Sequence, residues 1–381
     1  MATASRIRVL VVDDSAVIRH VVTTALKSDP GIEVVGTASN GRLALERIEE
    51  LTPDVVTMDI EMPVMDGLST LVELRPRWPR LPVIMFSALT ERGATATVEA
   101  LSRGASDYMT KPSGTTGLAD AAERIRAELI PKIKALCQRR QAFSRPASLR
   151  PARVPDTSVV RHCRVTAPPV PAAGSAPTGA AGPIDVIAIG VSTGGPAALS
   201  QLIPALPANL PVPVLIVQHM PPMFTTMLAD RLNTASSLTV VEATSAMAVR
   251  PGQVYVAPGD HHLGLQRKNG AVWTLIDDAP RENSCRPAVD VLFRYVASHY
   301  GGRSLGVMLT GMGHDGLEGS RGLCRLGARI IAQDEASSVV WGMPGAVVHA
   351  GIVERVLPLD ALADEIARRA SVGRSGARVA G

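Results

Sequence analysis

Short apolar runs alternate with amphipathic segments along the first third of the chain. Five of the runs have the length and the flanking turns of buried strands: 8–12 (RVLVV), 32–36 (IEVVG), 54–58 (DVVTM), 82–86 (PVIMF) and 106–110 (SDYMT). Segments with helical spacing of apolar residues separate them, so the pattern predicts repeated strand–helix units. With right-handed connections such units form a doubly wound parallel sheet, and the side chains that follow the strands gather beyond the strand carboxyl ends.

The first helix of this region is predicted over residues 15–28. Ser15 precedes the periodic stretch, and its hydroxyl can accept a hydrogen bond from the first helical turn. One apolar stripe is expected to face the core, and it consists of Val17, Val21, Val22 and Ala25.

The alternation stops near residue 138 and resumes near residue 184. The intervening segment contains SRPASLRPARVP and APPVPAAGSAPTGAAGP, a composition that cannot bury enough apolar area to order itself. After it, strands are predicted at 185–190, 213–218, 238–243, 253–258, 271–276, 304–309 and 328–333. Helices are predicted between several of them, at 196–206, 222–233 and 287–300.

These patterns predict an α/β protein with two domains, because 381 residues exceed what one core usually serves. The first domain is expected over 5–125 and the second over 184–372, each with a doubly wound parallel sheet. A helix end and a flexible linker are expected over 126–183, and a tail over 373–381. The predicted folds are flavodoxin-like for the first domain and Rossmann-like for the second.

Composition excludes some classes of partner. The net charge is only +4, and much of the basic excess lies in the predicted linker, so no nucleic-acid partner is expected. The cysteines, Cys137, Cys163, Cys285 and Cys324, share no CxxC or Cys/His ligand spacing. These cysteines therefore predict a reduced, cytoplasmic protein. Since no apolar run is long enough to span a bilayer, we also expect no membrane insertion.

Polar side chains follow four of the five predicted strands in the first domain. Asp13 and Asp14 follow the first strand, Asp59 the third, Ser87 the fourth and Lys111 the fifth. Three carboxylates at one sheet edge repel one another unless a hard cation such as Mg²⁺ lies among them. Asp59 would then attack a phosphoryl group whose charge Mg²⁺, Lys111 and Ser87 neutralise. Any one of these residues taken alone could be a helix cap or a solvent-facing side chain, so the prediction rests on the whole set.

The same region resembles the response-regulator receiver family through DDSAVIR, MDIEMPVMDG, MFSA and YMTKPS. The resemblance implies that Asp59 accepts a phosphoryl group from a histidine kinase. It also implies that Mg²⁺ is bound by Asp13, Asp14 and the main-chain carbonyl of Glu61. Ser87 and Tyr108 would couple phosphorylation to a change at the domain surface.

In the second domain, Gly190, Ser192 and Gly194 have the G-x-S-x-G spacing between a predicted strand and a predicted helix. Glycines there permit a sharp turn that exposes a nucleophilic serine, and the helix N-terminus favours a nearby oxyanion. A dinucleotide-binding loop is the alternative. It is disfavoured because Ser192 replaces the second glycine and because the next strand ends without the acidic residue that would bind a ribose.

A serine nucleophile needs a base and a carboxylate that orients the base. His219 follows the strand after Ser192, and Asp315 follows the strand at 304–309, so all three occupy strand carboxyl ends. They are candidates for nucleophile, general base and orienting acid. His261, His262 and His314 remain competing histidines, and Asp315 can also be read as a helix cap.

This half resembles the chemotaxis protein-glutamate methylesterase family through GVSTGG, QHMP, YVAPGDHHL, CRPAVDVLF, LTGMGHDG and WGMPGAV. The resemblance selects Ser192, His219 and Asp315 as a catalytic triad. By position, it implies that the Met312 main-chain N–H stabilises an oxyanion and that Thr193 orients the histidine or contacts substrate. It implies no cofactor in this domain. Cys285 stands where such proteins often carry another small or polar residue.

The function expected from both resemblances is hydrolysis of glutamate methyl esters on chemoreceptor cytoplasmic domains, with glutamine deamidation as a second activity. The receiver would cover the catalytic cleft until Asp59 is phosphorylated. The alternative is a response regulator with a non-catalytic binding or transcriptional output domain. Against DNA binding, this half shows no helix-turn-helix ending and no basic helix.

Overall fold

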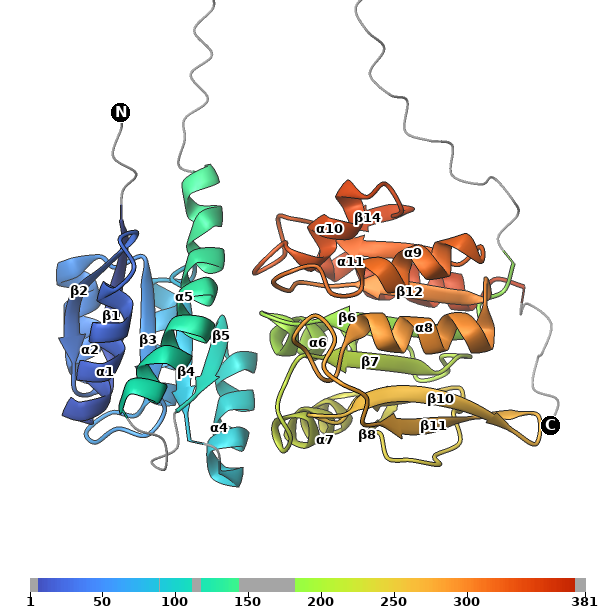
Figure 1. Ribbon diagram of the computed structural model, residues 1–381, viewed down its shortest axis with the longest axis horizontal. Coiled ribbons are helices and arrows are strands. Elements are labelled where there is room, and N and C mark those ends of the chain that lie inside the picture. The colour runs from blue at the N-terminus through green and yellow to red at the C-terminus, as the bar shows by residue number, and fades with distance from the viewer. Residues whose placement is uncertain (1–5, 89, 112–117, 144–181, 374–381) are drawn as a thin grey trace, which may run out of the picture.

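The computed structural model describes residues 6–88, 90–111, 118–143 and 182–373. Most of the predicted linker, residues 144–181, and the tail from residue 374 lie outside the described residues. The predicted domain and linker limits therefore remain predictions. The two folded parts stand side by side in Figure 1.

The first domain is a five-stranded parallel sheet with helices on both faces. The strand order is β2-β1-β3-β4-β5, which confirms the predicted doubly wound sheet. Its elements are β1 Ile7–Val12, α1 Ala16–Lys27, β2 Ile32–Ala38, α2 Gly41–Leu51, β3 Val55–Asp59, α3 Gly67–Arg77, β4 Val83–Ser87, α4 Glu91–Ser102, β5 Asp107–Thr110 and α5 Leu118–Phe143.

Helix α1 begins where the sequence predicts. Ser15 Oγ accepts a hydrogen bond from the Ile18 N–H at 3.4 Å and so caps the helix. Three of the four predicted core positions are buried, together with Leu26. Val17 was predicted to be buried but is 58% exposed. It lies in the first turn, one residue after the helix begins, and precedes the stretch from Val21 to Leu26 that supplies the buried side chains.

The second domain contains a seven-stranded parallel sheet in the order β14-β13-β12-β6-β7-β9-β8. Its strands are β6 Val186–Val191, β7 Val214–Gln218, β8 Thr239–Glu242, β9 Gln253–Val256, β12 Ser304–Met308, β13 Arg329–Gln333 and β14 Arg355–Leu357. Its helices are α6 Gly195–Leu202, α7 Phe224–Ala235, α8 Val289–Tyr300, α9 Leu317–Arg325, α10 Met343–His349 and α11 Leu359–Ala370.

One predicted strand lies outside this parallel sheet. The segment predicted at 271–276 is β11 Ala271–Asp277, which pairs antiparallel with β10 His262–Lys268 in a separate two-stranded sheet. Strands β10 and β14 were not predicted from the sequence. Strand β10 ends in charged residues, and β14 has only three residues, so neither produces a clear apolar run.

The order of strands in the second sheet determines where its polar loops meet. From β6 the chain passes to β7 on one side, and it later returns through β12 on the other side. Ligands of open parallel sheets bind at such a reversal, beyond the strand carboxyl ends. The segments after β6, β7 and β12 carry Ser192, His219 and Asp315.

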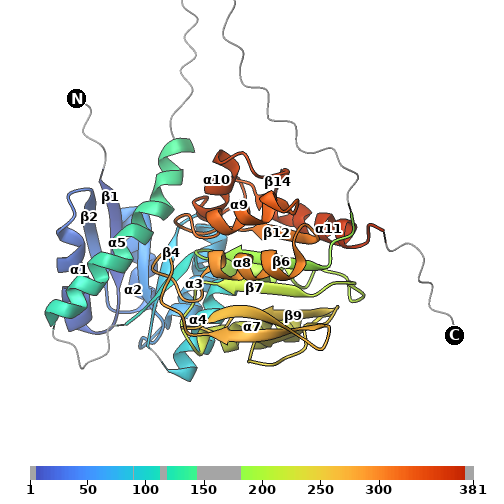
Figure 2. The same ribbon diagram turned by 45° about the vertical axis from the view of Figure 1, so that its right-hand side comes forward.

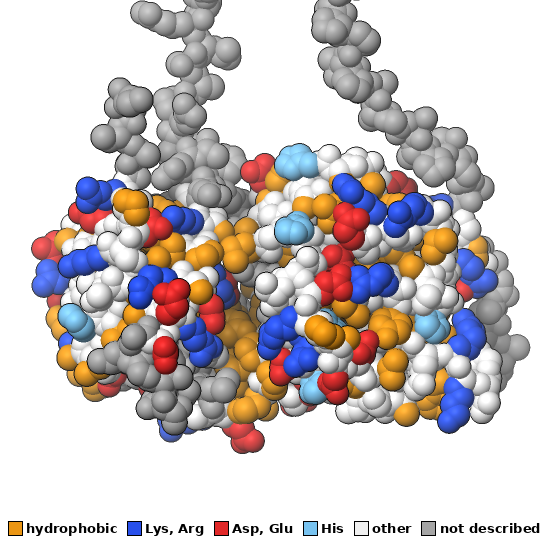
Figure 3. All heavy atoms as spheres, in the orientation of Figure 1, with side chains coloured by type: hydrophobic (Ala, Val, Ile, Leu, Met, Phe, Trp, Pro, Cys, Tyr) orange, Lys and Arg blue, Asp and Glu red, His pale blue; other side chains and the backbone are white. Residues whose placement is uncertain are grey.

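The two domains pack against each other. Helix α4 contacts α6 and α7, and both Figure 1 and Figure 2 show α4 beside α7. The Tyr108 ring, from β5, stacks on Phe224 of α7 with 5.2 Å between ring centroids. Apolar side chains line the seam in Figure 3, and one buried apolar cluster includes residues from both domains.

Over the described residues, we find no helix with the length and apolar character needed to cross a membrane.

Candidate functional sites

Ser192 lies in the turn that joins β6 to α6. Its main-chain N–H donates to the Thr310 carbonyl at 3.0 Å, and its own carbonyl accepts a hydrogen bond from the Gly195 N–H at 2.8 Å. This turn has a φ of 77° at Gly194, a conformation that glycine adopts without steric cost. Gly194 thus adopts the left-handed backbone conformation that the turn requires, and Ser192 does not have to adopt a positive φ.

Gly311 allows the loop after β12 to lie against the serine. A Cβ atom at Gly311 would be 2.9 Å from Ser192 Cβ and would also overlap the Met343 side chain. The next residue is Met312, whose main-chain N–H donates to no acceptor among the described residues. Ser192 Oγ makes no hydrogen bond within the same described ranges. Both groups are thus available to a ligand.

Asp315 is almost fully buried and is held by five hydrogen bonds. One comes from His219, and the other donors are the N–H groups of Val289, Asp290 and Gly316 and the Asn283 amide, at 2.7–3.1 Å. Val289 and Asp290 begin α8, so the carboxylate also caps that helix. Burial raises the pKa of Asp315, but the His219 bond and these other donors lower it to about 2. The carboxylate is therefore fixed in position and ionised.

His219 has a partner at each ring nitrogen. Nε2 lies 2.7 Å from Asp315 Oδ2, and Nδ1 lies 3.7 Å from Cys285 Sγ. Burial lowers the pKa of His219, but the hydrogen bonds with Asp315 and Cys285 raise it to about 9. The resting environment therefore favours the imidazolium form.

The structure brings His219 and Asp315 into direct contact but gives no hydrogen bond between Ser192 and His219, since both ring nitrogens are engaged elsewhere. Thr193 also differs from expectation. Its hydroxyl donates to Asp107 Oδ2 of the first domain at 2.9 Å and does not contact the histidine. Asn283, which donates to both Asp290 and Asp315, was not predicted as a site residue, because no periodic pattern marks a loop residue that bridges two carboxylates.

The predicted carboxylates of the first domain also meet. Ligand oxygens of Asp13, Asp14 and Asp59 all lie within 4.8 Å of one another. Lys111 Nζ is 3.1 Å from Asp13 Oδ2 and 2.7 Å from Asp59 Oδ2. Burial, aided by the Asp13 charge and opposed by Lys111, raises the pKa of Asp59 to about 6. The Lys111 ammonium therefore compensates only part of the negative charge of the three carboxylates.

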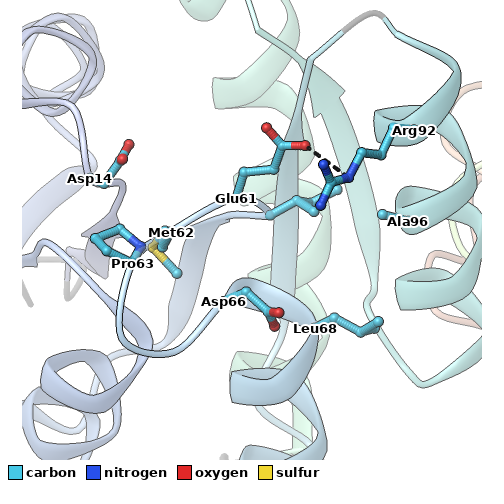
Figure 4. Close-up of a pocket in the computed structure, with 9 residues that line it drawn as sticks. Asp14, Glu61, Met62, Pro63, Asp66, Leu68, Arg92 and Ala96 are labelled. Carbon is cyan, nitrogen blue, oxygen red and sulfur yellow. Dashed lines mark ion pairs between the residues drawn. The ribbon is translucent and has the colours of Figure 1, made fainter.

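This donor set fits a hard divalent cation, because it consists of carboxylate oxygens that lie close together and near a protein surface cavity. The cavity has a volume of about 580 Å³, and Asp14 and Glu61 are among its lining residues. In Figure 4 the Glu61 side chain is directed toward Arg92, at 3.9 Å between charged atoms. Any contribution of Glu61 to a cation would thus come from its main chain.

Ser87 and Tyr108 are both buried, and among the described residues neither forms a hydrogen bond with Asp59. Ser87 Oγ donates to the Gly93 carbonyl at 3.0 Å, which ties it to the start of α4. The main-chain carbonyl of Tyr108 accepts a hydrogen bond from Lys132 at 2.7 Å. Burial raises the pKa of the Tyr108 phenol well above its usual value, so this side chain is neutral.

A cavity of about 640 Å³ lies at the junction of the domains. Its walls come from Tyr108, Arg124 and Lys132 of the first domain and from His219 and Cys285 of the second, among others. Beside it, Lys132 pairs with Asp107 at 3.0 Å, and Asp107 in turn accepts the Thr193 hydroxyl. The first domain thus directly contacts the residue that follows Ser192.

Comparison with known proteins covers both domains. The chain matches the family model "Response regulator receiver domain" over residues 9–123 and "CheB methylesterase" over residues 187–366. It is 50% identical over 363 residues to the protein-glutamate methylesterase/protein-glutamine glutaminase of a Nocardioides species, covering 95% of each chain. A protein of the same name from Trichodesmium erythraeum is 45% identical and covers 96% of this chain and 99% of its own length.

Among solved structures, the Thermotoga maritima CheB methylesterase catalytic domain is 44% identical, with a TM-score of 0.48. That match covers 49% of this chain and 98% of the solved domain. The relatives that match nearly the full length carry enzyme names. They support a catalytic output domain and not the binding or transcriptional alternative.

Proposed function

Because this chain belongs to the protein-glutamate methylesterase/protein-glutamine glutaminase family, we propose that Ser192, His219 and Asp315 carry out the family's hydrolysis. The chain is a carboxylic ester hydrolase governed by a receiver domain, with protein glutamine deamidation as its second activity. The observation that supports the assignment is the 2.7 Å contact between His219 and Asp315, a carboxylate that accepts five hydrogen bonds. Among the described residues, the Ser192 hydroxyl has no hydrogen-bond partner and so can act as the nucleophile.

The reaction is acyl transfer to water. Ser192 Oγ attacks the ester carbonyl carbon, His219 accepts the hydroxyl proton, and the carbonyl oxygen becomes an oxyanion that the Met312 N–H binds. The tetrahedral centre collapses, and His219 returns the proton to the leaving oxygen, so methanol departs. Water then attacks the acyl-serine with His219 as base, releasing glutamate and restoring Ser192. A glutamine substrate follows the same steps and releases ammonia.

His219 must be neutral to accept a proton, and the proton from Ser192 goes to Nδ1, since Nε2 is held by Asp315. In the resting structure Cys285 Sγ faces Nδ1. We therefore propose that substrate binding separates Cys285 from the ring and brings Nδ1 toward Ser192. The separation removes one of the interactions that raise the pKa of His219, which favours the neutral ring that catalysis needs. Catalytic hydrogen bonds are often long or unformed before substrate binds.

In the receiver domain, we propose that Asp59 accepts a phosphoryl group from the phosphohistidine of a kinase. Mg²⁺ would be held by Asp13, Asp14, Asp59 and the Glu61 carbonyl, and it neutralises charge on the phosphoryl oxygens when bound. Lys111 would pair with the same phosphoryl group. Ser87 would leave the Gly93 carbonyl to bind a phosphoryl oxygen, which pulls on the start of α4.

Regulation would pass through the domain junction. Helix α4 and the Tyr108 ring both contact the catalytic domain, and Asp107 holds the residue next to Ser192. We propose that the unphosphorylated receiver covers the catalytic site and that phosphorylation of Asp59 loosens this packing. The substrate would be the methylated cytoplasmic domain of a chemoreceptor, which places the reaction in the cytoplasm.

We expect Ser192→Ala to abolish methanol release from methylated receptor, because it removes the only group that forms the acyl-enzyme. The assay is released methanol, measured with the phosphorylated full chain. Labelling by a serine-directed fluorophosphonate should be lost as well.

Ser298→Ala is the matched control, since Ser298 lies exposed on α8, and it should keep both turnover and labelling. Phosphorylation of Asp59 should be equal in the three proteins. Methanol release by the Ser192→Ala variant at the rate of the control would remove the serine mechanism.

A further inference from the structure

Cys285 is held in a fixed position beside the imidazole of His219. The Glu282 and Cys285 main chains exchange hydrogen bonds of 3.0 and 2.8 Å, which closes a tight turn. Asn283 and Ser284, between them, adopt positive φ angles of 51° and 62°. The turn presents Sγ to His219 Nδ1 at 3.7 Å.

This separation is that of two ligands on one tetrahedral ion. Zn²⁺ binds thiolate at about 2.3 Å and imidazole at about 2.0–2.1 Å, and a tetrahedral angle then puts the two donor atoms about 3.6 Å apart. The observed value is 3.7 Å. An ion can therefore bridge the two side chains with little movement of either.

The other ring nitrogen gives a second, independent reason. A metal-binding histidine usually donates its remaining N–H to a carboxylate, which fixes the tautomer and turns the free lone pair toward the ion. His219 Nε2 makes that bond to Asp315 Oδ2 at 2.7 Å. Ligand atoms of His219, Cys285 and Asp315 all lie within 4.8 Å of one another.

The pair is also reachable. Both residues line the junction cavity of about 640 Å³, so water molecules can fill the remaining coordination positions. A nitrogen and a sulfur donor select soft or borderline ions over Mg²⁺ and Ca²⁺. This donor pair differs in kind from the carboxylate cluster of the receiver.

We infer that His219 Nδ1 and Cys285 Sγ bind Zn²⁺ or a similar thiophilic divalent ion, and that this ion inhibits the enzyme. An ion needs a thiolate and an unprotonated Nδ1, so binding releases to solvent the thiol proton and, from an imidazolium ring, the Nδ1 proton as well. Inhibition, though not binding, rests on the proposed function, because the ion occupies the nitrogen that would accept the Ser192 proton. Catalysis itself uses no ion at this position.

The binding test uses Co²⁺ as a spectroscopic probe with the reduced full chain, freed of metal by chelation and then saturated with Mg²⁺ to occupy the receiver. We expect thiolate-to-cobalt charge-transfer absorption in the near ultraviolet, and Zn²⁺ should remove it. Cys285→Ser should abolish the absorption. Cys324→Ser, which changes another half-buried cysteine, should retain it.

Absence of the absorption in the unaltered chain, or its persistence in Cys285→Ser, would overturn the inference, since an ordinary thiol–imidazole hydrogen bond gives no such band.

A methanol-release assay tests inhibition, with each variant compared to its own metal-free rate. Zn²⁺ should inhibit the unaltered chain, chelator should reverse it, and Cys285→Ser should need at least about tenfold more Zn²⁺ for half-inhibition.

The two proposals fail in different ways. Cobalt absorption without inhibition by Zn²⁺ would keep the metal site and contradict His219 as the catalytic base. Equal inhibition of the unaltered chain and Cys285→Ser would overturn the inhibitory site while leaving the serine mechanism intact.

Discussion

Asp315 is the residue whose surroundings most constrain its chemistry. It accepts hydrogen bonds from two N–H groups at the start of α8, from Gly316, from Asn283 and from His219. Nearly every lone pair of the carboxylate is therefore used. Such a group orients the imidazole and stabilises its positive charge without itself taking a proton.

We expect Asp315→Asn to lower kcat by about 10³–10⁴-fold, because the amide cannot hold the histidine in the required tautomer. The measurement is steady-state methanol release by the phosphorylated enzyme. KM should change much less than kcat, since Asp315 does not touch substrate in the proposed mechanism.

Asp364→Asn, a change at an exposed position of α11, is the control and should leave kcat unaltered. A loss of less than tenfold in Asp315→Asn would show that His219 does not depend on this carboxylate.

The positions of the three triad residues at strand ends could be predicted from the sequence, but the orientations of their side chains could not. Ser192, His219 and Asp315 each follow a recognisable apolar run, and parallel topology brings such positions together. The approach of Cys285 to His219 depends on a tight turn over 282–285. The Thr193 partner lies in the other domain. Neither the turn nor the docking of domains leaves a periodic pattern in the sequence.

At the scale of elements, helix α11 is fastened to β14 and its preceding loop by ion pairs. Glu365 is 6% exposed and pairs with Arg355 at 2.9 Å and with Arg369 at 2.7 Å. Arg369 also pairs with Glu354 at 2.9 Å. Burial raises the pKa of Glu365, but hydrogen bonds from Arg368 and Arg369 lower it to about 2.

A lowered pKa stabilises the fold above the unfolded-state pKa, and that stability is lost as the pH falls through the folded pKa. We therefore expect Glu365→Gln to destabilise the catalytic domain at neutral pH by on the order of 3 kcal/mol. The difference from the unaltered chain should shrink between about pH 5 and pH 2. Denaturant unfolding at a series of pH values measures it.

Glu335→Gln, at an exposed position, should show no such pH-dependent difference. A destabilisation by Glu365→Gln that stays constant down to about pH 2 would mean that lost packing, and not the ionised carboxylate, is responsible.

Most elements could be predicted because parallel strands buried on both faces read as continuous apolar runs. The exceptions have physical causes. Strand β10 carries polar and charged residues at its outer end, and β14 is too short to form a run. Val17 has helical spacing with the core stripe but lies in the first turn of α1, ahead of the buried stretch that starts at Val21, and is exposed.

At the scale of the whole molecule, the junction joins the two sites. Asp107 lies on the receiver side of this contact. It accepts a hydrogen bond from the Thr193 hydroxyl and forms an ion pair with Lys132. The Tyr108 ring beside it stacks on Phe224. Polar and aromatic contacts thus hold the receiver against the turn that carries Ser192.

We expect Asp107→Asn to raise methanol release by the unphosphorylated enzyme about 5- to 150-fold, the usual range of a coupling between two sites. The neutral amide weakens the bonds to Thr193 and Lys132, so the receiver covers the catalytic site less firmly. Methanol release without a phosphodonor is the measurement.

Combining Asp107→Asn with Asp59→Asn should keep the raised rate, because the junction acts after the phosphoryl acceptor. Asp120→Asn, at an exposed position of α5, should keep the low resting rate. A combined variant with the resting rate of the unaltered chain would place the effect of Asp107 upstream of Asp59.

The stacked pair of Tyr108 and Phe224 joins the receiver to the catalytic domain, so coupling through this contact also acts from the catalytic domain to the receiver. Coupling free energies are symmetric, so whatever a phosphoryl mimic at Asp59 contributes to receptor binding, a bound receptor must contribute equally to binding of the mimic. An occupied catalytic cleft would therefore hold the receiver in its activated form. Bound substrate would thus stabilise the activated form of the enzyme that demethylates it. Beryllofluoride should bind more tightly when a receptor peptide is present, by the same factor by which beryllofluoride tightens binding of the peptide.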